Sequence, residues 1–395
     1  MGALTSEIRS WLFGASGWGQ GDRLLSSILR DPPRTAGVAV NTATAQSLST
    51  VWACVALLSS TTAALPLHAY RRLPSGRERW DDHPAADLLT HAPNKFQTAF
   101  AFRESLMRCV LLYGNGFALI ERDAGGRPRS LTLLHPTSVQ ILADTSGLRY
   151  RVTWLDGTQS VLDDFHVLHV VGYSFDGIHG LSVIEAARRS LGLGIALEEF
   201  GGSFFANGST FGGVLSPAAA LTKDNEDRLR ASLEKRHHGV ERAHQFVILP
   251  VGIDYKPLGI PAEAAQFIES MKLSTATVAR WFGVPPSLVN SESGGTSMRY
   301  SSSEQEGIAF LTYGLGAQWL KRLEAAYNRS LVPNLERHHQ YLEHLVDGLL
   351  RADTGARWAA YEKAITLRVM DPDEVREREN LGPRRVSRPA EEGDA

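Results

Sequence analysis

The stretch Val284–Gly307 reads VPPSLVNSESGGTSMRYSSSEQEG and interrupts a chain that otherwise alternates between helical and strand patterns. Pro285 and Pro286 stop the preceding helical pattern, because proline lacks a backbone N–H and clashes with the turn before it. A run of serine and glycine follows and carries a single arginine, Arg299, before helical spacing resumes. The stretch therefore predicts a flexible loop between two long helices.

Helical spacing flanks this loop on both sides. Residues 262–282 carry an apolar row in steps of three and four, which predicts a long helix with one buried side. The row consists of Ala264, Ile268, Met271, Thr275, Val278 and Phe282. The polar side carries Gln266, Glu269, Lys272, Thr277 and Arg280. A second long helix is predicted over 302–330. Its Gly307, Gly314 and Gly316 each cost about 1 kcal/mol relative to alanine in a helix.

Upstream, the hydrophobic period changes to two. The segment LRYRVTW (148–154) places Tyr150 and Val152 on the same face of a strand, together with Leu148 and Trp154. Asp156-Gly157 follows and is a strong hairpin signal. FALIER, LTLLH, VQIL and FHVLHVV are further strand segments. These segments predict a mostly antiparallel sheet over about 114–173, preceded by helices over 44–64 and 98–112.

A small insert separates two helices after this sheet. Ser182 and Glu185 form a capping box that starts a helix over 182–206. A strand, a helix and a strand then occupy 211–260. Further helices are predicted over 335–353 and 356–365, and a last one begins with Asp371 as its cap, Pro372 at its first position and Glu374 completing the box. The predicted class is α+β.

Composition excludes several kinds of protein. The net charge is −2 and the pI is near 6.7, which argues against tight gripping of DNA but not against DNA that slides past. Cys54 and Cys109 lie in apolar surroundings without a CxxC motif, which predicts buried thiols in a reducing compartment. We expect no signal peptide and no membrane span.

No catalytic or cofactor motif was found in the sequence. GxxxxGK[ST], HExxH and GxSxG are all absent. Ser232 and Lys235 match SxxK, but they lie in a charged helical segment where a short match arises by chance. We expect neither cofactor nor metal. Two alternatives remain open at this point: a cytoplasmic multi-domain hydrolase with a dispersed site, and a head–tail connector without a DNA channel.

The order of parts resembles the portal proteins of tailed bacteriophages, of the long-tailed phage and gene transfer agent type. The matching stretches are LLYGNGFALIER, HVLHVVGYSFDGIHGLSVIEAA, FFANGSTFGGVL, ARWFGVPPSLV and RADTGARWAAYEKAI. The resemblance implies a flexible arm over 1–43, a wing over 44–181, a first stem helix over 182–210, a clip over 211–260, a second stem helix over 261–286, a tunnel loop over 287–301, a long wing helix over 302–330, a crown over 331–382 and a disordered tail over 383–395.

The resemblance also implies a function without catalysis. Portal subunits form a ring, twelvefold in particles, at one capsid vertex, after assembly in the bacterial cytoplasm, and double-stranded DNA passes through it during packaging and ejection. The implied partners are the large terminase, the head–tail adaptor and the major capsid protein. The implied DNA-facing loop residues are Ser293, Gly294, Gly295, Thr296, Ser297, Met298 and Arg299, and the polar side of the second stem helix is the implied channel face. One departure is Gln318, where family members often have proline.

Overall fold

The computed structural model of the protein describes residues 34–74, 76–80, 82–144, 147–206, 214–217, 223, 253–256, 261–289, 307–334, 336–346, 354–379 and 381. The chain divides into two compact units, Met1–His344 and Leu345–Ala395. Helices and antiparallel strands are both present, so the predicted α+β class is confirmed.

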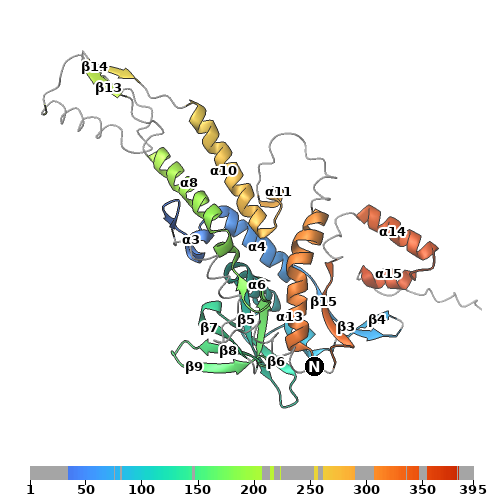
Figure 1. Cartoon of the computed structure of the whole chain (residues 1–395). Coiled ribbons are helices and arrows are strands. Elements are labelled where there is room, and N and C mark those ends of the chain that lie inside the picture. Colours follow the sequence, from blue (N-terminus) through green and yellow to red (C-terminus); the bar gives the residue numbers. More distant parts are fainter. Residues whose placement is uncertain are drawn as a thin grey trace, which may run out of the picture. The chain divides into compact units, whose positions relative to one another are not determined.

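Two helices of the first unit pack against each other (Figure 1). They are α4 (Ser49–Ala64) and α6 (Ala99–Tyr113), and they bury Val51, Leu58, Phe102 and Leu106. Both helices were predicted, but the first pattern is broken at Ser47 and separates α3 from α4. The short elements around them are β1 (Arg34–Thr35), β2 (Val38–Ala39), α3 (Thr42–Gln46) and α5 (Pro84–Thr90).

Six strands form two antiparallel sheets, in the orders β10-β5-β6 and β7-β8-β9. The strands are β5 (Asn115–Arg122), β6 (Pro128–Leu134), β7 (Val139–Asp144), β8 (Gly147–Thr153), β9 (Gln159–Asp163) and β10 (Val167–Val171), with the 3₁₀ turn η1 (Pro136–Ser138) between β6 and β7. Tyr150 and Val152 share a core with Phe117, Leu134 and Val167, as the period of two predicted. The predicted hairpin between β8 and β9 is confirmed, with Trp154–Gly157 closing the turn.

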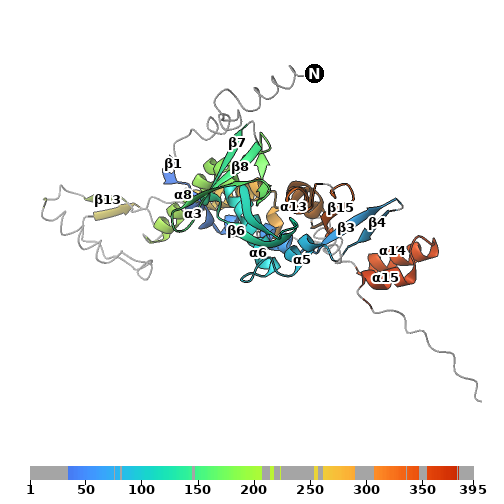
Figure 2. The same cartoon turned by 90° about the horizontal axis from the view of Figure 1, so that it is seen from below.

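A third antiparallel sheet joins distant parts of the sequence. β3 (Leu67–Leu73) pairs with β4 (Gly76–Arg79) on one side and with β15 (Gln340–His344) on the other, and the three strands lie side by side in Figure 2. The helix predicted over 335–353 is therefore wrong at 340–344. Leu342 and His344 are buried at alternate positions. Pairing with β3 satisfies the backbone groups that burial removes from water.

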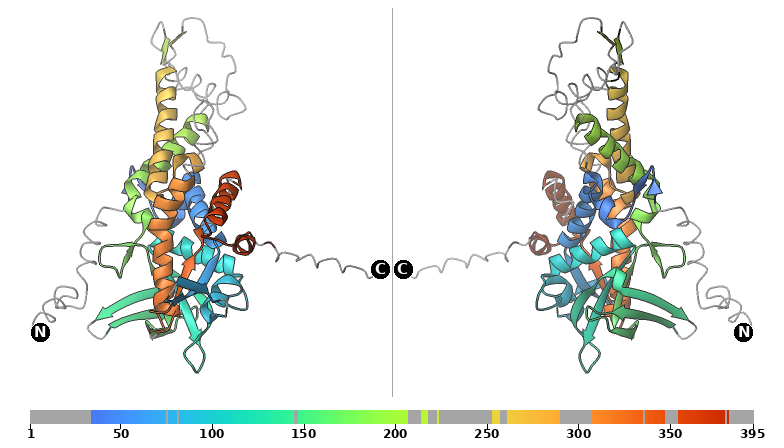
Figure 3. Two further views of the ribbon diagram at one scale, coloured as in Figure 1. Left: turned by 90° about the vertical axis from the view of Figure 1, so that its right-hand side faces the viewer. Right: turned by 90° about the vertical axis from the view of Figure 1, so that its left-hand side faces the viewer.

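The helices on either side of the predicted insert lie together (Figure 3). The first pattern is divided into α7 (Val183–Ala186) and α8 (Arg188–Ala206), and α10 (Pro261–Phe282) packs against α8. Ser182 caps α7 by accepting from the Glu185 N–H, which is one of the two bonds of the predicted capping box. β11 (Tyr173–Ser174) and β12 (Gly180–Leu181) form the hairpin before α7.

Two strands of the predicted insert are described. β13 (Val214–Pro217) pairs antiparallel with β14 (Ile253–Lys256). The predicted helix between them lies outside the described residues, apart from Lys223. A strand is therefore present at each end of the predicted insert, and the pairing of the two strands is an addition from the structure.

The second long helix is present but has an unexpected form. From Gly307 the described chain is helical, and it passes through a π-helix, η3 (Phe310–Leu320), into α13 (Lys321–Leu331). A Cβ on Gly316 would lie 2.5 Å from the Leu311 carbonyl oxygen, and a Cβ on Gly314 would lie 2.9 Å from the Gly283 carbonyl oxygen. The glycines that cost helix propensity therefore allow the wide π turn and a close backbone contact.

The second unit contains α14 (Thr354–Thr366) and α15 (Pro372–Arg378). The Tyr361 hydroxyl donates to Glu379 at 3.0 Å, and Val375 is buried. The Asp371 backbone N–H donates to the Glu374 carboxylate at 3.0 Å, as the predicted capping box requires. Among the described helices of both units, none combines the length and apolar character that a bilayer crossing demands.

Candidate functional site: the exposed face of α10 and its anchorage

The polar residues singled out on α10 lie on one face of the helix. Gln266, Glu269, Lys272 and Arg280 are exposed, and Thr277 is partly exposed with its hydroxyl donating to the Leu273 carbonyl at 2.8 Å. Leu273 itself is 66% exposed and lies in this face, four residues from both Glu269 and Thr277. Sequence reasoning missed Leu273 because it sought polar side chains, although the four-residue spacing places Leu273 there.

The apolar row of α10 is buried only toward its C-terminal end. Val278, Ala279 and Phe282 are buried, whereas Ile268 remains 55% exposed in the single chain. Ile268 and Phe282 lie fourteen residues apart in the same row. The chain alone therefore covers only part of the face that the pattern marks as apolar.

α8 holds α10 through small residues and ring contacts. A Cβ on Gly194 would lie 3.1 Å from the Ser274 hydroxyl, and a Cβ on Gly201 would lie 3.0 Å from the Phe267 ring. The Phe200 and Phe267 rings lie 5.5 Å apart between centroids. The glycines let the two helices approach closely, so that their side chains pack against each other.

The end of α10 is fixed against the π-helix. Gly283 has φ of 69° and continues into Val284, whose N–H donates to Ala279 at 3.0 Å. A Cβ on Gly283 would lie 2.8 Å from the Gln318 side-chain oxygen. Gln318 therefore packs where the chain leaves α10 and enters α11 (Pro286–Val289).

The loop residues predicted to face DNA fall outside the described residues. They are Ser293, Gly294, Gly295, Thr296, Ser297, Met298 and Arg299. The described chain stops at Val289 and resumes at Gly307. On one side of this segment the described chain ends with α11, which follows α10. On the other side it resumes with the helical residues that precede η3.

A backbone crossing fixes the start of α7 to the C-terminal end of α6. The Gly172 N–H donates to the Gly114 carbonyl at 2.8 Å, and the Ser182 hydroxyl donates to the Leu112 carbonyl at 2.6 Å. A Cβ on Gly180 would overlap the Gly114 carbonyl oxygen. Only glycine fits at Gly180, because the two backbones pass in direct contact.

A hydrogen-bonded chain of side chains lies beside this crossing. The Tyr150 hydroxyl and His169 Nδ1 are 3.1 Å apart, and His169 Nε2 and Asn115 Oδ1 are 3.0 Å apart. Asn115 Oδ1 also accepts from the Gly180 N–H at 3.0 Å. Burial, with a smaller effect from nearby His179 and Arg329, lowers the pKa of His169 to about 3. His169 is therefore neutral and joins the β8 and β5 strands to the hairpin before α7.

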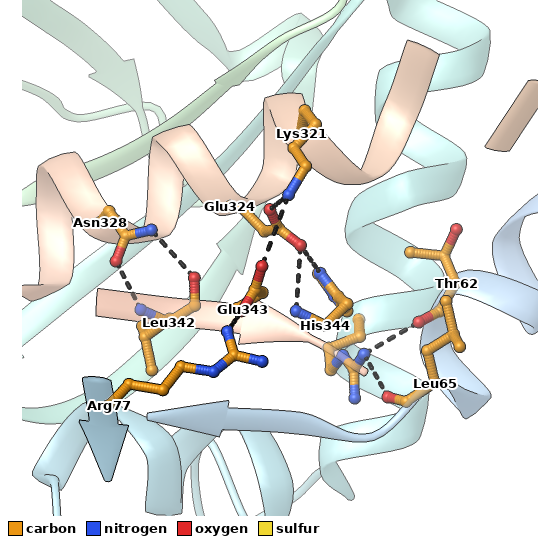
Figure 4. Close-up of polar contacts among 10 residues, drawn as sticks. Thr62, Leu65, Arg77, Lys321, Glu324, Asn328, Leu342, Glu343 and His344 are labelled. Atoms are coloured by element: carbon orange, nitrogen blue, oxygen red, sulfur yellow. Dashed lines mark hydrogen bonds and ion pairs between the residues drawn. The ribbon is translucent and has the colours of Figure 1, made fainter. Parts of the chain in front are cut away.

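A second buried network ties α13 to the third sheet (Figure 4). Glu324 accepts from the His344 backbone N–H at 3.0 Å and from Lys321 at 2.7 Å, and His344 Nδ1 lies 3.2 Å from the Glu324 carboxylate. The Asn328 side chain exchanges two hydrogen bonds with the Leu342 backbone, at 2.7 and 3.0 Å. These hydrogen bonds hold the backbone of β15 against α13, which explains why this polar segment forms a strand there.

The pKa shifts of this network indicate that Glu324 is ionised and that His344 is neutral. Burial alone would raise the pKa of Glu324, but hydrogen bonds from His344 and Lys321 outweigh it and lower that pKa. Burial is the largest effect on His344 and lowers its pKa, although Glu324 opposes the shift. A neutral His344 thus donates from Nδ1 to an ionised Glu324, which leaves His344 Nε2 without a partner among the described residues.

The described residues supply anchorage and a polar helix face. Within the described residues, no group of three or more histidine, cysteine or acidic side chains could hold a metal ion. Cys54 and Cys109 are buried free thiols, as predicted, and burial raises the pKa of Cys54 to about 12 and that of Cys109 to about 11. Neither thiol is suited to nucleophilic chemistry, because the thiolate is the reactive form.

The described chain thus carries a polar helix face, a glycine-packed helix pair and a strand pair between those two helices. Residues 49–380 match the family model of the phage portal protein, and the chain belongs to that family. It is a portal subunit of a particle's capsid vertex. Portal proteins are structural, and the ring they form makes this chain a homo-oligomer.

Similar proteins come from phages and from gene transfer agents. The portal protein of Enterobacteria phage HK97 is 32% identical over 342 residues, covering 85% of this chain and 79% of that protein. The probable portal protein of Streptomyces phage phiC31 is 30% identical over 354 residues, covering 86% of this chain and 76% of that protein. These two matches extend over most of the chain, as the quoted stretches implied.

Solved structures share the fold at lower identity. A chain from the neck of a native gene transfer agent particle, computed with C12 symmetry, matches with a TM-score of 0.59 at 21% identity and covers 97% of this chain and 100% of that chain. The crystal structure of an HK97 family phage portal protein from Corynebacterium diphtheriae matches with a TM-score of 0.56 at 20% identity, covering 80% of this chain and 99% of that chain.

Proposed function

We propose that twelve copies of this chain surround double-stranded DNA and that the exposed face of α10 lines their central channel. The observation that carries this assignment is the face itself: Glu269, Lys272 and Arg280 place both signs of charge around an exposed Leu273. A strongly basic surface would bind phosphates and resist movement, because each neutralised phosphate adds affinity. A mixed surface lets a duplex slide.

The loop over 287–301 is proposed to narrow this channel. It follows the end of α10, where Gly283 and Gln318 pack together. In a ring, Arg299 would be repeated once per copy near the phosphates. Salt screens such a charge over about 8–10 Å, so it can centre a duplex without holding it in one place.

The other parts receive roles by the same assignment. We assign the wing to 44–181, with contacts to the major capsid protein, and the clip to 211–260, with docking of the large terminase and then the head–tail adaptor. The stem helices are 182–210 and 261–286, and the crown is assigned to 331–382. β15 hydrogen-bonds to β3, which supports moving 340–344 from the crown to the wing. The protein itself is proposed to carry out no catalysis, and the motor supplies ATP hydrolysis.

The test compares packaged DNA per particle for four proteins: the parent, a deletion of Ser293–Ser297, Arg299→Ala and Arg299→Glu. The deletion should leave ring assembly intact, because a Ser/Gly segment buries little apolar area, but it should reduce DNA packaging or retention. Arg299→Ala should have a milder effect that depends on salt, and Arg299→Glu should be worse because it adds repulsion.

Electron microscopy of the rings controls for assembly. Normal packaging by the deletion would show that the loop does not act in the channel. Loss of rings would show that the loop is an assembly contact instead. Arg280→Glu tests α10 separately: it should lower packaging with rings intact if the α10 face lines the channel, and normal packaging would place that face elsewhere.

A further inference from the structure

Arg103 is a buried cation without an acidic partner in the part of the chain that the structure describes. It projects from α6, is 5% exposed, and donates from Nη2 to the Thr62 carbonyl at 2.9 Å and to the Leu65 carbonyl at 2.8 Å. No described carboxylate lies within ion-pair distance of it, and its Nε has no hydrogen-bond partner among the described residues. Burial lowers its pKa, which reflects the cost of holding the charge there.

The two carbonyls balance only part of this charge. They belong to the C-terminal end of α4, which carries a partial negative charge equivalent to about half an elementary charge. Burying a guanidinium is unfavourable unless a full counter-charge approaches it. Arg103 also has more donors than the two carbonyls can accept, since a guanidinium carries five N–H groups. The residue is therefore electrostatically incomplete in the single chain.

Arg103 lines an open cleft of about 470 Å³. The walls come from the end of α4, from β3, and from α5 and α6, and they are largely apolar: Ala64, Pro66, Trp80, Ala99 and Phe100 contribute. Phe100 is 46% exposed at this site. His68, Arg79 and His91 also line the cleft, and no aspartate or glutamate does.

We propose that this cleft binds a peptide segment of a partner protein that places an aspartate or glutamate carboxylate beside Arg103 and an apolar side chain against Phe100. The carboxylate would supply the missing counter-charge, and a charge-assisted pair with a guanidinium is among the stronger hydrogen bonds in proteins. The apolar walls would bury the neighbouring side chain. This site is separate from the channel face and does not depend on the proposed function.

The test uses two tripeptides and the purified full-length protein. The acidic probe is acetyl-Leu-Glu-Leu-amide, and the matched probe replaces glutamate with glutamine, which has the same shape without charge. We expect the acidic peptide to bind at least about tenfold more tightly, because a hydrogen bond to a charged group contributes more than a neutral one. Calorimetry or ligand-detected NMR measures both affinities.

Three variants separate the cleft from the rest of the surface. Arg103→Met should remove the preference for the acidic peptide. Since that change also removes the cap of α4 and can reduce folding, Ala64→Trp is the second variant: Ala64 is exposed in the cleft, and a large ring there should block both peptides while Arg103 keeps its bonds. Phe96→Ala is the control, because Phe96 is 93% exposed and does not line the cleft. It should change nothing.

Three other results would each overturn the proposal. Equal binding of the two peptides would show that the cleft binds apolar side chains without distinguishing glutamate from glutamine. Competition by sodium sulfate or acetate with no advantage for the tripeptide would show an anion site and not a peptide site. Absence of binding would show that Arg103 serves only as a helix cap. All three readings come from purified protein, so they are independent of any result on DNA packaging.

Discussion

At the scale of single residues, His169 links a buried hydrogen-bonded chain to the pH dependence of stability. Its folded-state pKa of about 3 lies below the unfolded value near 6.5. Between these values the unfolded chain binds a proton that the folded chain does not, so stability falls as pH decreases from about 6.5.

We expect His169→Gln to remove this contribution. The parent should lose stability on acidification from pH 6 to pH 4.5, and the variant should lose about 1.4 kcal/mol less per pH unit over that range. The absolute stability of the variant should be lower throughout, because His169 stacks on Phe117 with centroids 4.5 Å apart. Urea unfolding at a series of pH values measures both effects.

His91→Gln is the matched control, since the His91 side chain is 77% exposed. It should reproduce the parent's slope. An unchanged slope in His169→Gln would mean that His169 protonates in the folded state without penalty. His83 and His344, whose pKa values burial also lowers, act in the same direction and remain in both proteins.

At the scale of elements, the π-helix η3 reverses the usual effect of replacing a helical glycine. Alanine ordinarily stabilises a helix by about 1 kcal/mol relative to glycine. A Cβ at Gly316 would lie 2.5 Å from the Leu311 carbonyl oxygen. Gly316→Ala should therefore destabilise the protein by about 1–3 kcal/mol, as overpacking does.

Gly307→Ala provides the comparison. Gly307 lies in the same helical run, and a Cβ there would meet no atom within 4 Å. This variant should be neutral or slightly more stable, and thermal unfolding of both proteins decides the matter. If Gly316→Ala were also stabilising, the helix would have reverted to α geometry without loss, and η3 would not depend on that glycine.

How far these elements could be predicted depends on which interactions define them. Local patterns predict α6, α10 and the β8–β9 hairpin. Their signals are a capping residue, an apolar stripe and an Asp-Gly turn, and each signal lies within the element itself or next to it in sequence. β15 could not be predicted this way: Leu342 and His344 become buried only because β3 and α13 lie beside them. The close approach of Gly314 in η3 to the Gly283 carbonyl could not be predicted either, because these two glycines are far apart in sequence.

The same distinction between local and long-range interactions holds for the candidate site. The exposed face of α10 was predicted from spacing, and Gln266, Glu269, Lys272 and Arg280 are exposed as expected. Leu273 was missed because a polar face was sought. The crossing at Gly180 gave no local signal, since a glycine required by a distant backbone looks the same in sequence as a glycine in a turn.

At the scale of the whole molecule, exposed apolar side chains support assembly. Leu193, Phe200, Ile268 and Trp281 on α8 and α10 are about half exposed in the single chain, between 46% and 55%. Covering such a surface is favourable by about 25 cal/mol per Å² of apolar area. We expect the purified protein to form rings, and native mass spectrometry should show integer multiples of the 43.2 kDa chain.

Ile268→Glu should weaken these rings, because it places a charge where a neighbouring copy would exclude water. Leu155→Glu is the control: Leu155 is fully exposed at the β8–β9 turn, away from α10 in the sequence. A monomer across a range of salt concentrations, in the parent protein, would contradict ring assembly. Equal ring stability in both variants would place the interface on another surface.

The crossing of Gly114, Gly172 and Gly180 has a mechanical consequence. At this point one main chain rests directly on another, with no side chain between them to change rotamer and absorb strain. A force applied along α7 and α8 would therefore reach the β5 and β10 strands through stiff peptide groups, and the bond from Ser182 to Leu112 would transmit it to the end of α6. The crossing should therefore be rigid. We expect α8 and these strands to move as one body, without bending at the short link between them.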